Sequence, residues 1–260
     1  MASCVSANAS RASRRRAWPW PSATGNGRSW RASVWVGSGK VVPYRAEAIV
    51  AFPSDWAGER LLGRELLRGA VQAPRVWRPQ GNWQRWYRVV FEQILPVHVL
   101  RCSGLVFINF FSDQILDPMI QGLVRRCPFR DRVVLEWVER PAGARRLARA
   151  GGVFQGLREE GFSLAIDDVG AGADGLGRWA LVQADFVKAS GHLLHRARAD
   201  VGARAVLRSL GHAIRDEGHA RYIVEWVERW DDWWLAQECG ADAWQGFLSR
   251  KRPVSAGGCE

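Results

Sequence analysis

Acidic, amide and lysine side chains recur near the ends of the short apolar runs in this chain. A polar residue at the end of one strand is usually the solvated boundary of that strand, but the repetition along successive runs favours a shared site. A parallel α/β barrel brings the carboxyl ends of its strands to one rim, where such folds build their active sites. The residues are Asn109, Glu136, Asp167, Asp168, Lys188, Glu225 and Gln245.

Carboxylates predominate in this set, and they repel one another in a cleft unless a cation or a proton offsets their charge. The adjacent pair Asp167 and Asp168, converging with Glu47, Glu136 and Glu225, predicts a bound divalent metal. Oxygen ligands without a nearby Cys or His select hard cations. We therefore expect Mg²⁺ or Mn²⁺ rather than zinc.

The segments that must position these residues alternate between short β-branched runs and longer amphipathic stretches, which is typical of repeated β-α units. Helices are expected at 114–126, 142–160, 193–216 and 231–239, the third with a break at Gly202 or Gly211. Strands are expected at 105–110, 133–138, 162–167, 185–188, 222–227 and 243–247. Together they predict an α/β barrel with a mainly parallel sheet.

The length of 260 residues matches a single barrel of this kind. Residues 1–30, rich in Ser, Ala, Arg and Gly, are predicted to be a disordered basic tail, and 31–258 to be the barrel domain.

The net charge of +11 favours anionic partners. The five cysteines form no CxxC pair, which argues against a disulfide framework or a zinc cluster and favours a reducing cytoplasm. No apolar run approaches the roughly 20 residues of a membrane helix.

The motifs, taken in order over about residues 32–255, resemble those of the EAL domain family of cyclic-di-GMP phosphodiesterases. Glu47-Ala48-Ile49 resembles the signature tripeptide, and the segment at 166–172 resembles the DDFGTG loop. Residues 107–110 resemble the strand that ends in the family's asparagine, and 135–139 resemble its E-x-T-E segment. Residues 187–188 lie where the family has its lysine. Residues 224–228 resemble AEGVE, and 245–247 resemble QGY.

The resemblance implies a TIM-like (β/α)8 barrel with one strand antiparallel, often dimeric, that hydrolyses cyclic di-GMP to linear pGpG in bacterial second-messenger signalling. It implies that one ion is bound by Glu47, Asn109, Glu136 and Asp167, and a second by Asp167, Asp168 and Glu225. Two ions about 4 Å apart can activate water, neutralise the phosphate and stabilise the leaving alkoxide. Neither a membrane nor a nucleic acid polymer is an expected partner.

Four residues receive further roles. Glu225 would orient or deprotonate the attacking water, and Gln245 would anchor a ligand or water by hydrogen bonds. Lys188 would either add positive charge near the phosphate or neutralise the acidic cluster as an ion pair. By resemblance, Glu139 would stabilise the loop after Asp168.

Two departures from the family pattern support an alternative function. Ala51 stands where the EALLR motif would carry a phosphate-binding arginine, and Trp226 replaces a glycine beside Glu225. The alternative is a catalytically degenerate EAL domain that acts as a cyclic-di-GMP receptor or a protein-interaction module. An unrelated metal-dependent barrel hydrolase is a third reading, but it would not explain the ordered set of motifs.

Overall fold

The computed structural model describes residues 30–36, 40–53, 60–68, 80–101, 103–172 and 174–250, with backbone only for 30–43, 68, 80–82 and 250. The predicted tail lies outside the described residues except for Trp30, and so does the predicted end of the barrel domain at 251–258. Among the described residues, no helix is both long and apolar enough to cross a bilayer.

The strands form one sheet in sequence order, and pairing between β2 and β9 closes the strands from β2 to β9 into a barrel. β2 is antiparallel to both β3 and β9, whereas every pairing from β3 to β9 is parallel. The predicted barrel with one reversed strand is therefore confirmed. The strands are β1 (Trp30–Val36), β2 (Lys40–Ala51), β3 (Arg60–Arg68), β4 (Leu105–Phe110), β5 (Val133–Trp137), β6 (Ser163–Val169), β7 (Phe186–Ala189), β8 (Arg221–Val224) and β9 (Ala243–Gln245).

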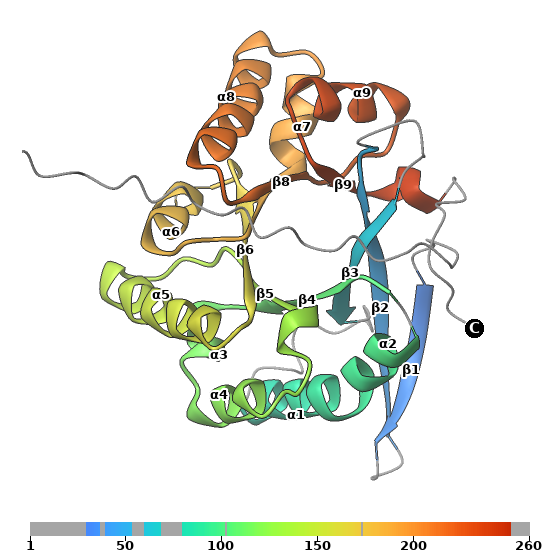
Figure 1. Ribbon diagram of the computed structural model, residues 1–260, viewed down its shortest axis with the longest axis vertical. Coiled ribbons are helices and arrows are strands. Elements are labelled where there is room, and N and C mark those ends of the chain that lie inside the picture. Colours follow the sequence, from blue (N-terminus) through green and yellow to red (C-terminus); the bar gives the residue numbers. More distant parts are fainter. Residues whose placement is uncertain are drawn as a thin grey trace, which may run out of the picture.

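The helices surround the parallel strands, while the β1–β2 hairpin occupies the side of the barrel away from α5 and α6 (Figure 1). A π-helical stretch, Val90–Ile94, joins the first two helices, and 3-10 turns lie at Arg130–Arg132 and Phe247–Arg250. The helices are α1 (Gln80–Val89), α2 (Leu95–Arg101), α3 (Ser112–Ile115), α4 (Pro118–Arg125), α5 (Ala144–Glu159), α6 (Gly175–Leu181), α7 (Gly191–Ala197), α8 (Val201–Glu217) and α9 (Trp230–Glu238).

The long helix expected at 193–216 is two helices, and neither Gly202 nor Gly211 separates them. The break falls before Asp200, whose side chain caps α8 by accepting hydrogen bonds from the backbone N–H groups of Gly202 at 2.8 Å and Ala203 at 3.2 Å. An aspartate in this position satisfies helix N–H groups that would otherwise lack partners. The side-chain cap, rather than a glycine, therefore defines the boundary.

The barrel interior is filled by a layer of buried apolar side chains, to which every strand from β2 to β9 contributes. The layer consists of Ile49, Ala51, Leu62, Phe107, Val134, Ala165, Phe186, Ile223 and Ala243. Side chains along a strand alternate between its two faces. On the strands from β4 to β9, the residue two places beyond each layer member therefore also points into the barrel, one level nearer the rim.

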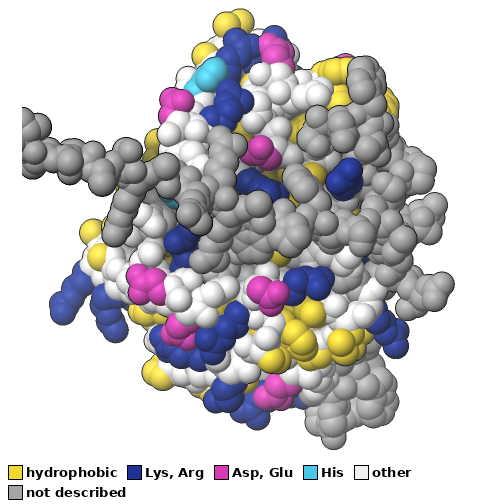
Figure 2. Space-filling view, in the orientation of Figure 1, with side chains coloured by type: hydrophobic (Ala, Val, Ile, Leu, Met, Phe, Trp, Pro, Cys, Tyr) yellow, Lys and Arg dark blue, Asp and Glu magenta, His cyan; other side chains and the backbone are white. Residues whose placement is uncertain are grey.

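On the described part of the face shown in Figure 2, basic side chains are interspersed with acidic ones rather than gathered into one patch. A single basic stripe of the kind that binds a nucleic acid polymer is not seen there.

Gly211 of α8 lies against the chain that follows α9. A Cβ at this position would lie 2.1 Å from the carbonyl oxygen of Cys239 and 3.2 Å from the Tyr222 ring. We expect Gly211→Ala to lower the free energy of unfolding by about 1–3 kcal/mol through overpacking. Urea unfolding followed by circular dichroism measures the change.

The matched control is Gly152→Ala in α5, where a Cβ would meet nothing within 4 Å. Alanine should raise stability there by about 0.5–1 kcal/mol, because it is the better helix former. Equal effects of the two substitutions would contradict the close packing of α8.

Candidate metal centre

The polar residues of the parallel strands form a second layer inside the barrel, two positions beyond the apolar layer. Phe107 precedes Asn109 and Ile223 precedes Glu225 by two residues, so both members of each pair face inward. The same spacing relates Val134 to Glu136, Ala165 to Asp167, Phe186 to Lys188 and Ala243 to Gln245. The structure thus brings together the predicted residues of six strands.

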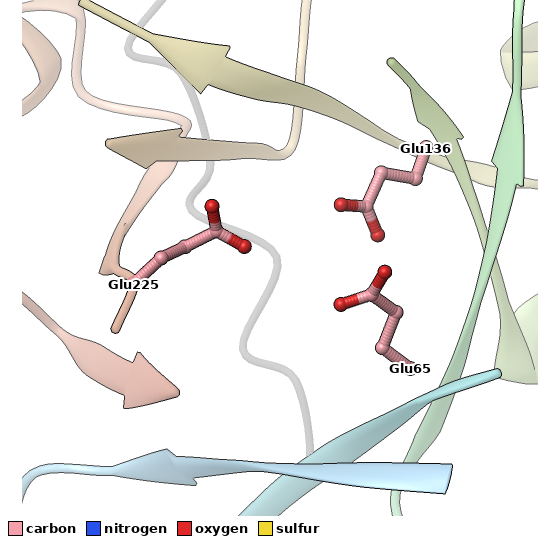
Figure 3. A group of neighbouring side chains, drawn as sticks. All are labelled: Glu65, Glu136 and Glu225. Atoms are coloured by element: carbon pink, nitrogen blue, oxygen red, sulfur yellow. The ribbon is translucent and has the colours of Figure 1, made fainter. Parts of the chain in front are cut away.

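Glu65 of β3, which the sequence analysis did not select, lies at the centre of this layer. Its Oε1 accepts a hydrogen bond from Asn109 Nδ2 at 2.5 Å, and its Oε2 accepts one from Gln245 Nε2 at 2.7 Å. Carboxylate oxygens of Glu65, Glu136 and Glu225 lie within 4.8 Å of one another, and the three side chains converge (Figure 3). Asp167, Asp168 and Glu225 form a second such group. The two groups share Glu225.

Glu47 lies next to this layer but, among the described residues, in neither carboxylate group. It pairs directly opposite Glu65 in the β2–β3 ladder. Its carboxylate lies 3.3 Å from Arg45 Nε and 3.4 Å from Gln245 Nε2, at the edge of the pocket above the layer. The place expected for Glu47 is thus held by Glu65.

The interpretation of Ala51 as a missing phosphate contact is wrong. Because β2 runs against its neighbours, its carboxyl end lies at the opposite end of the barrel from the polar layer. Ala51 pairs with Arg60 and Ala243, which begin β3 and β9, and it belongs to the buried apolar layer. An arginine there could not contact a substrate at the rim.

Lys188 is the buried cation of the layer. Its Nζ lies 2.7 Å from Glu225, 3.2 Å from Glu65 and 3.4 Å from Asp167, and it donates a short hydrogen bond to Glu136. Burial alone would lower the pKa of Lys188, but these carboxylates raise it well above the ordinary lysine value. The ion-pair role considered for Lys188 is therefore present in the structure.

One lysine does not compensate all of the acids. Burial raises the pKa of Glu136 well above its ordinary value, and repulsion from Glu65 adds to this. Burial also raises the pKa of Glu225 well above its usual range, with repulsion from Asp167. In contrast, the pKa of Glu65 is lowered, because Lys188 and hydrogen bonds from Gln245 and Asn109 outweigh its burial.

Several buried oxygens of the layer have no hydrogen-bond partner among the described residues, namely Asn109 Oδ1, Glu136 Oε2 and Gln245 Oε1. Each is an acceptor, and leaving a buried acceptor unsatisfied costs about 1–3 kcal/mol. Amide and carboxylate oxygens are the ligands that hard divalent cations prefer. The residues therefore fit Mg²⁺ or Mn²⁺.

Arg178 of α6 supports the layer from behind. Its guanidinium is fully buried and donates to the backbone carbonyl oxygens of Asp167, at 2.8 Å, and Trp137. It also donates to Asp174 at 3.1 Å and lies 3.5 Å from Glu139. One side chain thus fastens the ends of β5 and β6, each beside a predicted ligand.

Glu139 lies beside the loop that follows Asp168, where the resemblance places a loop-stabilising residue. A Cβ on Gly172 would be 1.8 Å from Glu139 Oε1, so the loop approaches this carboxylate as closely as glycine allows. Asp168 itself has a φ of 56°, in the left-handed region that Asp tolerates better than most residues. The turn leaves carboxylate oxygens of Asp167 and Asp168 within 4.8 Å of each other.

A pocket of about 460 Å³ opens above the layer. Its lining includes Glu65, Asp167, Asp168, Glu225 and Gln245. This volume falls within the roughly 300–1,000 Å³ of small-molecule sites. The buried carboxylates therefore communicate with a cavity of ligand size.

The fold and the site define an α/β barrel protein with a buried acidic centre, and a family model identifies its family. The model of the EAL domain matches residues 86–251, so the chain belongs to the EAL domain family. The matched span begins after both Glu47 and Glu65 and does not distinguish between them. No curated protein matches this chain.

Solved structures with the same fold share little sequence with this chain. BlrP1 of Klebsiella pneumoniae, in complex with manganese and cyclic di-GMP, has a TM-score of 0.65 at 20% identity, covering 85% of this chain and 59% of that chain. The EAL enzyme Bd1971, bound to cAMP, has a TM-score of 0.64 at 18% identity, covering 81% and 62%. A standalone EAL protein of Vibrio cholerae O395, bound to cyclic di-GMP, has a TM-score of 0.62 at 19% identity, covering 78% and 88%.

This chain therefore spans about three fifths of the length of Bd1971 and BlrP1. At these identities the likeness concerns the fold alone.

The raised pKa values of Glu136 and Glu225 predict a pH-dependent effect of metal on stability. Above the ordinary glutamate pKa of about 4.3, the folded metal-free protein binds more protons than the unfolded chain, so its unfolding free energy falls as pH rises. Lys188 stays protonated in both states at neutral pH and adds no slope. A divalent cation replaces the protons, so Mn²⁺ should raise Tm more at about pH 8 than at about pH 5.5.

Thermal unfolding in EDTA and in excess Mn²⁺ measures this effect. At a metal concentration about 100 times the Kd, the stabilisation at the higher pH should be about 2.7 kcal/mol. The exposed pair Arg125–Glu160 provides a control, because Glu160→Gln should leave the pH dependence unchanged. A Tm increase that is equal at the two pH values would contradict the prediction.

Arg178→Met should weaken Mn²⁺ binding by about 10- to 100-fold, because the carbonyls beside Glu136 and at Asp167 lose their donor. Calorimetric titration with Mn²⁺ measures the affinity, and circular dichroism checks that the variant is folded. Arg178→Lys should recover part of the loss, and the surface variant Arg125→Met should match the parent. If folded Arg178→Met bound Mn²⁺ with the affinity of the parent protein, Arg178 would not be needed to support the site.

Proposed function

We propose that this chain is a metal-dependent phosphodiesterase that hydrolyses cyclic di-GMP to linear pGpG. The observation that carries the proposal is the pair of adjoining carboxylate groups that share Glu225 and open into one pocket. Membership of the EAL domain family supports it. The BlrP1 structure, with manganese and cyclic di-GMP together, shows that this fold accommodates both in a related protein.

In this proposal Glu65, Asn109, Glu136 and Asp167 hold one Mg²⁺ or Mn²⁺, and Asp167, Asp168 and Glu225 hold the second. Glu65 takes the place first assigned to Glu47. When bound, the ions supply charge compensation for the phosphate and lower the pKa of water. The other parts of the reaction fall to the side chains of the chain itself.

Glu225 orients the attacking water and accepts its proton at the carboxylate. Its membership of both carboxylate groups supports this role. Lys188 keeps Glu225 and Glu136 in place and offers positive charge near the phosphate. Gln245, whose buried Oε1 accepts no hydrogen bond from the described part of the chain, anchors substrate or water. Glu139 stabilises the loop after Asp168.

The homodimer and the cytoplasmic location expected from the sequence belong to the same proposal, and so does a barrel domain at 31–258. The family model supports the domain assignment over residues 86–251.

A receptor without activity is the second candidate, and Trp226 is the observation that favours it. This indole, 42% exposed, lines the pocket directly beside the proposed proton acceptor. The other argument for the receptor, Ala51, no longer applies, because Ala51 lies at the opposite end of the barrel. Binding without turnover in the parent protein would support the receptor and contradict the enzyme.

Glu65→Gln and Glu225→Gln should each reduce kcat by about 100-fold or more, because one loses a metal-binding charge and the other a general base. The assay follows linear product from cyclic di-GMP with Mn²⁺, using purified protein. Glu47→Gln is the matched control, because Glu47 pairs directly opposite Glu65 but is outside both carboxylate groups. Its kcat should stay within about tenfold of the parent. If kcat fell equally in Glu47→Gln and Glu65→Gln, the assignment of Glu65 in place of Glu47 as a metal ligand would be contradicted.

A further inference from the structure

Trp226 has a backbone conformation that a bulky side chain rarely adopts. Its φ is 56°, in the left-handed region where glycine is the common residue. Strained residues of this kind persist where the surrounding structure fixes them, and they cluster at ligand sites. Trp226 directly follows Glu225, so its strained backbone lies beside the carboxylate groups and is consistent with a role in ligand binding.

The indole is held against the beginning of α7. A Cβ on Gly191 would lie 2.0 Å from Trp226 Cγ, so only a glycine leaves room for the ring. The ring centroid lies 4.5 Å from that of His192 and 5.5 Å from that of His195, and His195 Nε2 lies 3.3 Å from the Trp226 carbonyl oxygen. These contacts fix the ring on one side and leave 42% of the residue exposed.

The exposed part of Trp226 borders the pocket above the carboxylates. The neighbouring loop adds a second aromatic ring there, since Phe247 is 52% exposed and also lines the pocket. Hydrogen bonds join the two loops, from Val227 N–H to the Gln245 carbonyl at 3.0 Å and from Leu248 N–H to the Val227 carbonyl at 3.0 Å. The pocket thus has an acidic floor and an aromatic edge on the β8–β9 side.

We propose that Trp226 is a specificity residue of this site, on which one purine base of a cyclic dinucleotide stacks while the phosphate faces the carboxylate groups. The inference rests on the proposed function. A fixed, half-exposed indole is suited to this role because stacking needs an available ring face and little loss of side-chain freedom. Gly191 acts with it as the residue that gives the ring its position.

The test measures binding of cyclic di-GMP, with Ca²⁺ in place of Mn²⁺, to the parent, Trp226→Ala, Trp226→Phe and Trp234→Ala. Trp226→Ala should weaken binding by about 5- to 150-fold, the range expected for one lost base stack. Trp226→Phe should fall between the parent and Trp226→Ala. Trp234 is the matched control, because it is 62% exposed and does not line this pocket.

Two further measurements separate stacking from a purely structural role. Mn²⁺ affinity without nucleotide should stay within about twofold in Trp226→Ala, because the carboxylates are unchanged. A cyclic dinucleotide with 2-aminopurine in place of one guanine should lose fluorescence on binding to the parent and lose less with Trp226→Ala. Gly191→Ala should reproduce the weaker nucleotide binding, because its Cβ displaces the ring.

Parental nucleotide affinity in Trp226→Ala would overturn the inference while leaving the proposed function intact. A lower Tm in Trp226→Ala with unchanged nucleotide affinity would do the same and assign the ring to packing on α7. A parent protein that neither binds nor hydrolyses cyclic di-GMP would overturn the proposed function, and this inference with it.

Discussion

The charge balance around Lys188 is the interaction on which the centre of this barrel depends. Five carboxylates, those of Glu65, Glu136, Asp167, Asp168 and Glu225, meet at one rim. Three of them lie within 3.4 Å of the buried ammonium of Lys188, and a fourth, Glu136, accepts a short hydrogen bond from it. Burying such a cluster is costly unless each charge has a partner. Lys188 meets part of this requirement, and the raised pKa values of Glu136 and Glu225 show that it does not meet all of it.

The polar layer could be predicted from the sequence along the parallel strands because one simple rule places it. From β4 to β9, an apolar residue that faces the interior is followed two positions later by a polar residue that faces the same interior. Asn109, Glu136, Asp167, Lys188, Glu225 and Gln245 follow this rule, and the structure brings them together. Local alternation and the parallel arrangement were sufficient for these positions.

The first two barrel strands could not be placed in the same way. The apolar pattern of a strand is the same in both directions, so the reversal of β2 is invisible in its residues. Glu47 and Glu65 both stand in apolar runs and pair directly opposite each other. Only the side-chain contacts distinguish them, because Glu65 accepts hydrogen bonds from both Asn109 and Gln245, whereas Glu47 accepts a longer one, at 3.4 Å, from Gln245. The roles of Arg178 and Trp226 could not be predicted from local sequence, because each depends on a contact with a residue tens of positions away. Arg178 donates to the Trp137 carbonyl, and Trp226 packs against Gly191. The position of Glu65 within the apolar run at 61–67 does follow the pattern of an acid in a strand, so this residue could have been found from the sequence.

The seam that closes the barrel is short, and part of the metal centre belongs to it. β2 pairs with β9 at only three positions, Ile49 with Gln245, Val50 with Trp244 and Ala51 with Ala243. Gln245 also donates to Glu65 across the interior. Anything that binds Glu65 and Gln245 together therefore also holds β3 and β9, the two barrel strands that flank β2, against each other. A ligand that binds both residues in the closed barrel would therefore stabilise that closed form.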